Sequence, residues 1–359
     1  MRKFKFGLIG GGLAGPLTAG ALKKMPQAEL TSFCDINDTL FTRYKEEFGV
    51  QKCFTDYKEL IGQQELDIVC IATPPFHHKE AVLNSCKAGK HIIVEKPLAI
   101  NLLEADEMTE ACEKSGVQLG VIAMYRFMEP ASIIKKALEE KRLGKIIGVS
   151  CLGKSFRDDA YYDSAGWRGT WWGEGGGSLI SQTIHFIDLM LYFLGEVSSV
   201  QGHYRTTIHP EIEVDDMAVA NLVFQNGAVG NIFSSTAAQP GYPRRLEIHG
   251  EKGTIILEEE KIVEWKVEGM EEIEFLTREG KASGDTSSKA GFVNSDYHQS
   301  QIEDFIKALE EGRKPMVDGL EGRKTLEVIR GIYQAGDRNQ TIRFPVKDKK
   351  EFGKRHPLT

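Results

Sequence analysis

The sequence predicts an α/β fold, in which an N-terminal doubly wound parallel sheet is followed by a C-terminal α+β domain with an open, mainly antiparallel sheet. Up to residue 124, short apolar runs alternate with segments of helical periodicity, as in a parallel sheet covered by helices. Beyond it, strand-like runs follow one another through hairpin signals, which favours antiparallel pairing. The 359 residues suit two domains, which we place at 1–124 and 125–359.

Composition and charge exclude several classes of function. With 41% hydrophobic and 27% charged residues, the chain resembles ordinary globular proteins, and no apolar run reaches membrane-spanning length. The net charge of -7 argues against nucleic acid as the main partner. All six cysteines lie in the first 151 residues and none forms a C-x-x-C pair, so we expect buried thiols in a reducing compartment. We therefore expect a cytoplasmic protein without nucleic-acid or membrane partners.

The first strand and helix enclose a glycine-rich turn. Phe4–Ile9 reads as a strand, Gly10, Gly12 and Gly15 match G-x-G-x-x-G, and Pro16–Lys24 has a helical pattern. The first glycine permits the tight turn, the second allows close approach of a pyrophosphate, and the third allows helix–strand packing. The phosphates would lie at the helix N-terminus, where unpaired N–H groups favour anions. This context predicts a dinucleotide site that includes the backbone of Leu13 and Ala14.

A carboxylate closes the second predicted strand. Leu30–Cys34 is followed by Asp35, 20 residues after Gly15. A carboxylate in this place accepts hydrogen bonds from ribose hydroxyls and repels a 2′-phosphate. Ile36 and the two residues after it bring no arginine to offset that repulsion. We therefore predict NAD as the cofactor in preference to NADP.

The alternation of strands and helices continues to residue 123. The expected helices are Thr39–Phe48, Tyr57–Ile61, Phe76–Ala88 and Leu102–Ser115. The expected strands are Asp67–Ala72, Ile92–Val94 and Gln118–Ala123.

A lysine follows the strand Ile92–Val94 directly. Glu95, Lys96 and Pro97 come next, and ligands of open α/β sheets bind beyond the carboxyl ends of strands. Pro97 restricts the backbone of Lys96, and a lysine at the rim of an apolar sheet can act as an acid, a base or a charge stabiliser. The alternative is a solvated Glu-Lys pair on a loop.

The second half reads as a strand-rich unit. The expected strands are Lys145–Leu152, Val197–Thr206, Met217–Phe224, Gly227–Ser235, Arg244–Gly250 and Thr254–Leu257. The expected later helices are His298–Glu311 and Gly322–Arg338. We expect Glu258–Ser288, which is charged and poor in aromatic residues, to be a surface excursion.

The stretch Tyr161–Leu194 combines aromatic residues with a helix. Trp167, Arg168 and two further tryptophans precede a triple glycine, and a helical run follows from Ser178 to Leu194. An indole face and a guanidinium suit a sugar ring, although tryptophans are more often core residues. On the helix Ser181, His185 and Asp188 follow i, i+4, i+7 and are expected to share one face.

Several polar residues have two readings. Arg126, at the end of the strand before it, either reaches substrate or cofactor or forms an ion pair at the domain seam. Tyr162 and His298 are weaker candidates of the same kind. The nine histidines show no H-x-x-x-H and no cysteine–histidine cluster, so we predict no metal.

The motifs together resemble the Gfo/Idh/MocA oxidoreductases, the glucose–fructose oxidoreductase and inositol dehydrogenase family. The resemblance covers most of the chain. It is carried by Gly10–Gly15, Asp35, Ala72–His78, Ala88–His91, Glu95–Pro97, Gly175–Gly177, His185, Asp188, His298–Phe305 and Gly319–Thr325.

The resemblance implies a Rossmann domain and an NAD-dependent enzyme that oxidises a secondary hydroxyl of a sugar, glycoside, nucleotide sugar or cyclitol, or reduces the keto form. It implies that Lys96 and His185 are catalytic and that the bond before Pro97 is cis. In that family the open sheet commonly mediates homo-oligomerisation, so the resemblance implies a dimer or tetramer. The cofactor-binding residues, beyond those named above, would be Ala72, Thr73, Pro74, His78, Glu95 and Lys96. The substrate-binding residues would be Lys96, Arg126, Tyr162, Trp167, Arg168, Ser181, Gln182 and His185.

The chain departs from the commonest pattern of this family. Ser181 stands where aspartate is usual, and Thr183 stands where glycine is usual. Ser181-Gln182 and the Trp167–Trp171 segment resemble a subset of nucleotide-sugar and glycoside 3-dehydrogenases instead. Two alternatives are a redox-neutral, NAD-dependent glycosidase and a non-catalytic protein that senses a dinucleotide.

Overall fold

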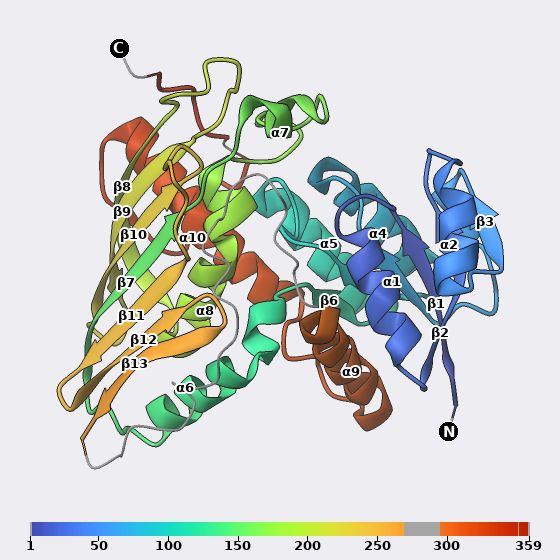
Figure 1. Ribbon diagram of the computed structural model, residues 1–359, viewed down its shortest axis with the longest axis horizontal. Helices are drawn as coiled ribbons and strands as arrows, with labels where there is room; N and C mark the ends of the chain where they lie inside the picture. Colours follow the sequence, from blue (N-terminus) through green and yellow to red (C-terminus); the bar gives the residue numbers. More distant parts are fainter. Residues whose placement is uncertain (1, 269–294, 351, 358–359) are drawn as a thin grey trace. The chain divides into compact units, whose positions relative to one another are not determined.

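A computed structural model describes residues 2–268, 295–350 and 352–357. The chain forms two compact units (Figure 1), Met1–Met124 with Val293–Arg323 and Tyr125–Phe292 with Lys324–Thr359. The return of the chain to the first unit was not part of the sequence-based division. Gln301, on helix α9 (Ser295–Glu311), accounts for it, since its side chain accepts from Ala123 N at 3.0 Å and donates to Val121 O at 2.7 Å.

The first unit is a parallel sheet, as predicted, and it has six strands. Its order is β3-β2-β1-β4-β5-β6. The strands are β1 (Phe4–Ile9), β2 (Ala28–Cys34), β3 (Lys52–Phe54), β4 (Ile68–Ile71), β5 (His91–Val94) and β6 (Leu119–Val121). The order reverses between β1 and β4, and at such a switch point the carboxyl ends of the strands leave room for a ligand. The three-residue β3 was missed because it is too short to show a period.

The helices of this unit begin and end at recognisable caps. They are α1 (Gly15–Lys24), α2 (Leu40–Phe48), α3 (Tyr57–Ile61), α4 (His78–Lys87), α5 (Leu102–Ser115) and α9. Asp56 caps α3 and Asn101 caps α5 through side-chain oxygens, and Gly116 ends α5 in the left-handed conformation. The predicted helix Phe76–Ala88 begins instead with a 3₁₀ turn, Pro75–His77, in which His77 N donates to Pro74 O at 3.0 Å.

The second unit is an eight-stranded mixed sheet. Its order is β13-β12-β11-β7-β10-β9-β8-β14, with β7 and β10 parallel and the other neighbours antiparallel. Its strands are β7 (Ile146–Lys154), β8 (Val197–Arg205), β9 (Met217–Phe224), β10 (Val229–Ser235), β11 (Arg245–Gly250), β12 (Gly253–Glu258), β13 (Lys261–Val267) and β14 (Ile342–Arg343).

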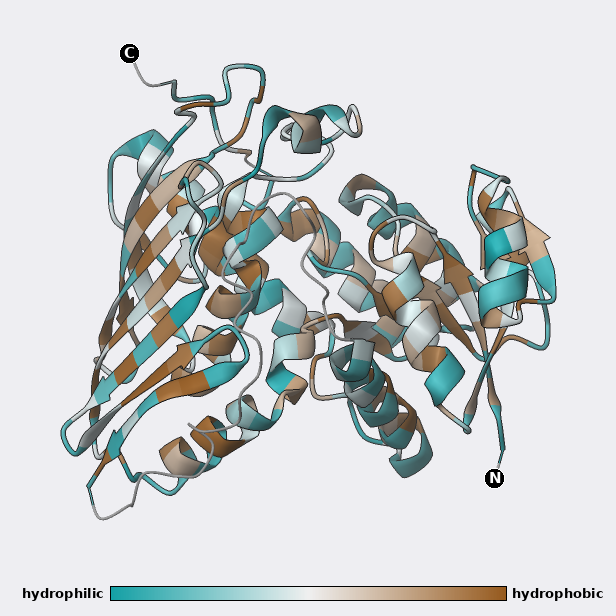
Figure 2. Ribbon diagram, in the orientation of Figure 1, coloured by the Kyte–Doolittle hydropathy of each residue, from teal (hydrophilic) through white to brown (hydrophobic). Residues whose placement is uncertain are grey.

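One face of this sheet is covered and the other is open. Buried and exposed residues alternate along β8 and β9, and Figure 2 shows the corresponding bands of apolar and polar residues. Helix α8 (Ile184–Leu194), almost wholly apolar and buried, packs against β7 and β11. The remaining helices of the unit are α6 (Glu129–Glu139), α7 (Asp159–Asp163) and most of α10 (Gly319–Arg338).

One expectation for this unit was wrong, and one helix was missed. Strand β13 occupies the start of the predicted excursion, because Ile262, Trp265 and Val267 supply a buried face; residues 269–288 of that excursion lie outside the described residues. Helix α6 was missed, although Ala131, Ile134 and Ala137 bury one helical face.

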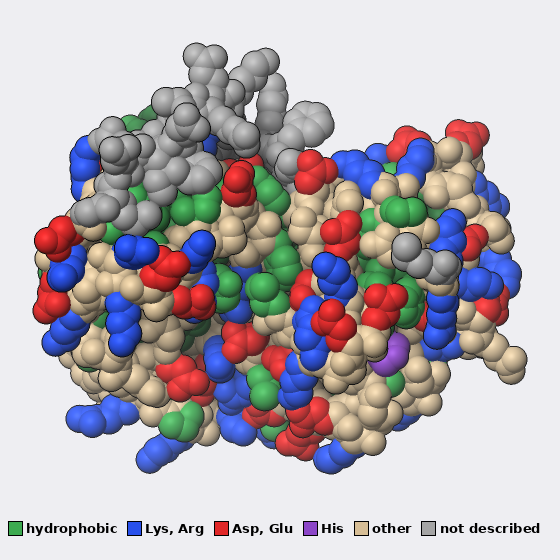
Figure 3. Space-filling model, turned by 90° about the horizontal axis from the view of Figure 1, so that it is seen from below, with side chains coloured by type: hydrophobic (Ala, Val, Ile, Leu, Met, Phe, Trp, Pro, Cys, Tyr) green, Lys and Arg blue, Asp and Glu red, His purple; other side chains and the backbone are tan. Residues whose placement is uncertain are grey.

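The surface shows no single dominant charge where it can be seen. Figure 3 shows Lys and Arg side chains interspersed with Asp and Glu on the face that it presents, in keeping with the small net charge of -7. Within the part of the chain that the structure describes, no helix is long and apolar enough to cross a membrane.

We predict that Gly177→Ala destabilises the second unit. An added Cβ would lie 1.8 Å from the carbonyl oxygen of Asp215, which is backbone and cannot move aside. A loss on the order of 3 kcal/mol would lower the melting temperature by about 6–12 °C. Gly20→Ala is the control, since its Cβ meets no described atom within 4 Å and helix propensity favours alanine by about 1 kcal/mol. Calorimetry of both variants checks this, and an unchanged melting temperature for Gly177→Ala would contradict it.

Candidate functional site

Two positions of the glycine turn after β1, Gly10 and Gly15, have no room for a side chain. Gly10 has φ +99°, and a Cβ on it would lie 2.5 Å from the carbonyl oxygen of Ala72. A Cβ on Gly15 would lie 2.4 Å from the carbonyl oxygen of Gly10, whereas one on Gly12 meets none of the described atoms within 4 Å. The N-cap residue of α1, Ala14, has no side chain to accept from the first-turn amides, and no other described side chain caps this helix. The turn therefore leaves N–H groups and open space at a helix N-terminus, which suits a phosphate.

Asp35 is held in place beside this turn. Its Oδ2 accepts from Gly11 N at 2.7 Å and its Oδ1 accepts from Asn37 N at 2.8 Å. Each oxygen keeps a second lone pair for a ribose hydroxyl. Leu13 and Ile36, on either side, are 67% and 92% exposed, which is unusual for large apolar residues and suits a flat ligand ring.

The end of β4 contributes a buried hydroxyl. Ala72 N donates to Ile9 O at 2.7 Å, which fixes the segment beside the glycine turn. Thr73 Oγ1, the next side chain, is buried, and it has no hydrogen-bond partner among the described residues. A buried hydroxyl without a partner is costly, so this atom also fits a bound dinucleotide that would supply one. Pro74, which follows, is half-buried and starts the 3₁₀ turn.

His78 acts inside the first unit. It is fully buried, with Nε2 at 3.0 Å from Thr73 O and Nδ1 at 3.0 Å from Pro97 O. Burial lowers the pKa of its imidazole, and the carbonyls and the charge of Glu95 only partly offset this. Both ring nitrogens are engaged by the chain, so His78 joins the ends of β4 and β5 rather than offering a ring nitrogen to a cofactor.

Lys96 lies on the turn after β5. The Lys96–Pro97 bond is cis, as the resemblance implied. Glu95, before it, is buried; its Oε2 accepts from Lys96 N at 3.2 Å, and its Oε1 lies 3.5 Å from His298 Nε2. Burial raises the pKa of Glu95, but the contact with His298 and the charges of His298 and Lys96 lower it on balance. His298 on α9 therefore contacts Glu95, the residue before Lys96, and forms a buried pair with it.

In the second unit, the helix that carries His185 begins irregularly. Leu179–Thr183 is a π-helix, and α8 starts only at Ile184. A π-helix has i→i+5 hydrogen bonds, so its turn is wider than that of an α-helix. Ser181 still lies about one turn before His185, and the shared face of Ser181, His185 and Asp188 stays a prediction. Thr183, at the end of the π-helix, packs closely against Gly153 of β7, because a Cβ on Gly153 would lie 2.2 Å from Thr183 Oγ1.

His185 is 9% exposed and lies beside groups that the sequence did not single out. Its ring centroid is 5.3 Å from that of Tyr125. Tyr125 Oη accepts from Arg244 Nη2 at 2.6 Å, and Arg244 also pairs with Glu259 at 2.6 Å. Burial raises the pKa of Tyr125, so the phenol stays neutral next to the imidazole. Arg244 is far from His185 in sequence, and only its place before a strand could have suggested it.

Arg126 forms the ion pair that the sequence left open. Its Nε and Nη2 each donate to the Asp188 carboxylate at 2.8 Å, and Thr325 Oγ1 donates to the same carboxylate at 3.0 Å. The guanidinium is buried and lies 5.0 Å from the ring of Tyr192. These contacts give Arg126 and Asp188 a structural role inside the second unit.

An arginine–tyrosine cluster, made of Arg157, Tyr161, Arg168 and Gln182, lies on the same unit. Arg168 donates to Tyr161 Oη at 2.7 Å, and its guanidinium carbon lies 4.6 Å from the Trp167 ring. Arg157 Nη2 donates to Gln182 Oε1 at 2.7 Å and its guanidinium carbon lies 5.3 Å from the Tyr161 ring. Burial raises the pKa of Tyr161 to about 12. The cluster offers fixed donors, a neutral phenol and an indole within one segment.

Tyr162 lies behind this cluster. Its Oη is 2.8 Å from Thr236 Oγ1, and its ring packs in the core with Ile212 and Val214. It therefore supports the segment from inside. Among the described residues, no group of histidine, cysteine or carboxylate side chains could hold a metal ion.

Comparison with known proteins agrees with this geometry. The model of the oxidoreductase family with an NAD-binding Rossmann fold matches residues 4–123, and that of the GFO/IDH/MocA C-terminal domain matches residues 132–256. The myo-inositol 2-dehydrogenase of Thermotoga maritima is 32% identical over 330 residues, which cover 90% of this chain and 93% of that protein.

Two solved structures are also similar. The WlbA dehydrogenase of Bordetella pertussis, in complex with NADH and UDP-GlcNAcA, is 29% identical with a TM-score of 0.84, covering 96% of this chain and all of that one (100%). A levoglucosan dehydrogenase in complex with NADH and levoglucosan is 25% identical with a TM-score of 0.83, covering 96% and 100%. The chain belongs to the Gfo/Idh/MocA oxidoreductases, with an NAD-binding Rossmann domain followed by the C-terminal domain of that family.

Proposed function

We propose that this oxidoreductase uses NAD to oxidise a secondary hydroxyl of a sugar, glycoside, nucleotide sugar or cyclitol, or to reduce the corresponding ketone. The observation that carries the proposal is the turn after β5, at the ligand-binding end of the sheet. Lys96 lies on this turn directly after Glu95, which is buried and pairs with His298. The relatives named above support the substrate class, since they are dehydrogenases of a cyclitol, a nucleotide sugar and an anhydrosugar.

The residues of the first unit would hold the cofactor by its phosphates and ribose. The Gly10–Gly15 turn and the N-terminus of α1 bind the pyrophosphate, and Asp35 binds the adenosine ribose. Leu13 and Ile36 cover the adenine side, and Thr73 Oγ1 gains a partner. NAD supplies the hydride acceptor when bound.

The protein's own catalytic groups would be Lys96 and His185. His185 accepts the proton of the substrate hydroxyl as the general base. Lys96 donates a hydrogen bond to the reacting oxygen and stabilises the negative charge that develops there. Tyr125 limits where the His185 ring can lie, because Arg244 fixes the phenol through a 2.6 Å hydrogen bond.

The second unit would recognise the sugar. We assign substrate contacts to Trp167, Arg168, Ser181 and Gln182, because an indole face suits the CH groups of a sugar ring and the polar groups suit its hydroxyls. Arg168 is already oriented by Tyr161, which reduces the entropy lost on binding. Arg126 and Tyr162 support this recognition from the core.

We also propose that the protein is cytoplasmic. All six cysteines are thiols and five are buried, as expected in a reducing compartment.

Two variants test the catalytic assignment. We expect Lys96→Met and His185→Gln each to lower kcat with a sugar substrate by about 10²–10⁴-fold, because each removes a group that acts on the transferred proton or the developing charge. NADH affinity, followed by fluorescence, should change little, because the phosphates are held by the glycine turn. Lys87→Met, at an exposed lysine of α4, is the control. A Lys96→Met protein that keeps most of its turnover would refute the assignment, as would a parent that cleaves glycosides without net reduction of NAD.

A second variant tests the cofactor preference. Asp35→Asn keeps an oxygen for Gly11 N but removes the charge that repels a 2′-phosphate. We expect the ratio of kcat/KM for NADP to that for NAD to rise by about tenfold, which is about 1.4 kcal/mol. Asp38→Asn, an exposed carboxylate of the same loop, should leave that ratio unchanged. Equal use of both cofactors by the parent would contradict the role of Asp35.

We further propose that the open face of the second unit joins copies of this chain. It exposes Ile147, Val219, Val223, Val229 and Val263, which are 39–57% accessible. Val223 and Val229 are cross-strand neighbours, so Val223→Lys with Val229→Lys places two like charges together in this face.

Light scattering after gel filtration should show an oligomer for the parent and a smaller mass for the double variant. Ile208→Lys, an exposed apolar residue outside the sheet, is the control. A monomeric parent would exclude this interface.

A further inference from the structure

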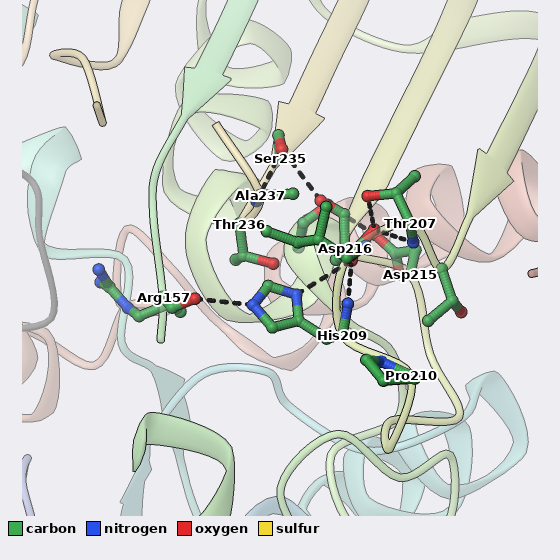
Figure 4. Close-up of polar contacts among 12 residues, drawn as sticks. Arg157, Thr207, His209, Pro210, Asp215, Asp216, Ser235, Thr236 and Ala237 are labelled. Atoms are coloured by element: carbon green, nitrogen blue, oxygen red, sulfur yellow. Dashed lines mark hydrogen bonds and ion pairs between the residues drawn. The ribbon is translucent and has the colours of Figure 1, made fainter. Parts of the chain in front are cut away.

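The loop of residues 206–216, between β8 and β9, is built around one buried carboxylate. Asp216 Oδ1 accepts from Thr207 N and Thr207 Oγ1, both at 2.7 Å. Its Oδ2 accepts from Ile208 N at 2.9 Å and lies 3.0 Å from His209 Nδ1 (Figure 4). Asp216 is fully buried, so its carboxylate is hydrogen-bonded by the loop and is shielded from solvent.

His209 faces an oxygen at each ring nitrogen. Nδ1 meets Asp216 Oδ2 at 3.0 Å, and Nε2 meets the carbonyl oxygen of Arg157 at 2.8 Å. Both oxygens are acceptors. A neutral imidazole has one N–H, so it would leave a nitrogen lone pair against an oxygen lone pair at one of these contacts. Only the imidazolium satisfies both.

We propose that His209 is a positioning residue, held as an imidazolium between Asp216 and Arg157, and that its second proton keeps the arginine–tyrosine cluster in the geometry that binds substrate. The second half of this statement rests on the proposed function. His209 is 3% exposed and touches no substrate in this role.

The charges around His209 favour its protonated form. Burial lowers the pKa of His209, but the hydrogen bonds to Asp216 and to the Arg157 carbonyl, with the charges of Asp216 and Asp159, raise it above the ordinary value of 6.5. The pKa of Asp216 is lowered on balance for the same reason, since its hydrogen bonds outweigh burial. Tyr162 of α7 also faces the imidazole, with ring centroids 4.9 Å apart. His78 also faces an oxygen at each ring nitrogen, but both are uncharged carbonyls, and burial lowers its pKa.

The loop is hydrogen-bonded to the segments that carry the arginine–tyrosine cluster. Arg157 is fixed through its backbone by His209 and by Arg157 N donating to Thr236 O at 2.8 Å, and its side chain reaches Gln182. The backbone N–H of Glu213, from the same loop, donates to Gly169 O at 2.7 Å. The contact at His209 Nε2 is therefore one of those that position Arg157.

Loss of the second proton should release Arg157. Because the folded pKa is raised, the contact is intact below the ordinary pKa of 6.5 and is lost as the pH rises through the folded value. Arg157 orients Gln182, a proposed substrate contact, and takes no part in proton transfer, so the loss should raise KM for the sugar and leave kcat nearly unchanged.

The protonation state can be measured without substrate. In protein labelled with ¹³C-histidine, a pH titration of assigned imidazole signals should show His209 titrating above 6.5, so that the doubly protonated form predominates at pH 6.5. A His209 that is mostly neutral at pH 6.5 would overturn the proposal. Because this measurement uses the parent protein, it decides the point whether or not a sugar is turned over and whether or not any variant folds.

The positioning role is tested by His209→Gln, which has an uncharged amide that cannot donate at both contacts. We expect KM for the sugar to rise roughly tenfold, kcat to stay within about threefold, and the rise of KM at high pH to disappear. His249→Gln is the matched control, since that histidine is 39% exposed at its side chain and has a single hydroxyl neighbour, Thr254, within hydrogen-bond distance. An unchanged KM in His209→Gln, with NADH affinity intact, would overturn the positioning role.

Discussion

The second unit depends on one buried carboxylate, Asp215. It accepts from Gly177 N at 2.9 Å, Ser178 Oγ at 2.6 Å, Leu179 N at 3.3 Å and Tyr333 Oη at 2.6 Å. These donors lie in the segment Gly175–Ser178, the π-helix and α10, so one side chain ties three segments together. Burial raises the pKa of Asp215 even though all four donors act to lower it, which shows how far from water the group lies. Four donors around one carboxylate leave little freedom in the segment that leads to His185.

Buried pairs of opposite polarity recur behind the candidate functional residues. Glu95 with His298 lies behind Lys96, and Asp216 with His209 lies behind Arg157. Arg126 with Asp188 anchors the helix that carries His185. Such pairs add little net stability, since desolvation offsets the attraction, but breaking one leaves a buried charge and is costly. Their effect here is to fix geometry while the residues that face a ligand keep their own hydrogen-bonding capacity.

The sequence was sufficient for the parts of the fold that local rules control. The glycine turn, Asp35 and the β5–Lys96 boundary could be found because each depends on near neighbours in the chain: a φ of +99° at Gly10, a carboxylate closing β2, and a run of β-branched residues. The parallel order of the first sheet followed from the alternation of strands and helices.

The groups that the sequence did not reveal depend on distant contacts. Arg244 meets Tyr125 across 119 positions, and Tyr333 meets Asp215 across 118. No period or motif marks such pairs. The π-helix was missed for a similar reason, because Ser178–Leu194 has an ordinary helical pattern and the wider turn accompanies the approach of Gly153 on β7 to Thr183.

The π-helix also makes segment length a determinant of recognition. A turn closed by i→i+5 bonds takes up one residue more than an α-helical turn, so deleting one residue from Leu179–Thr183 would allow a continuous α-helix while the segment before it keeps its orientation. The residues inside the turn would change their places relative to His185. Ser181 and Gln182 would then point elsewhere while the composition stayed almost the same. A designer who wished to change the sugar that this protein accepts could therefore vary the number of residues in this turn as well as their identity.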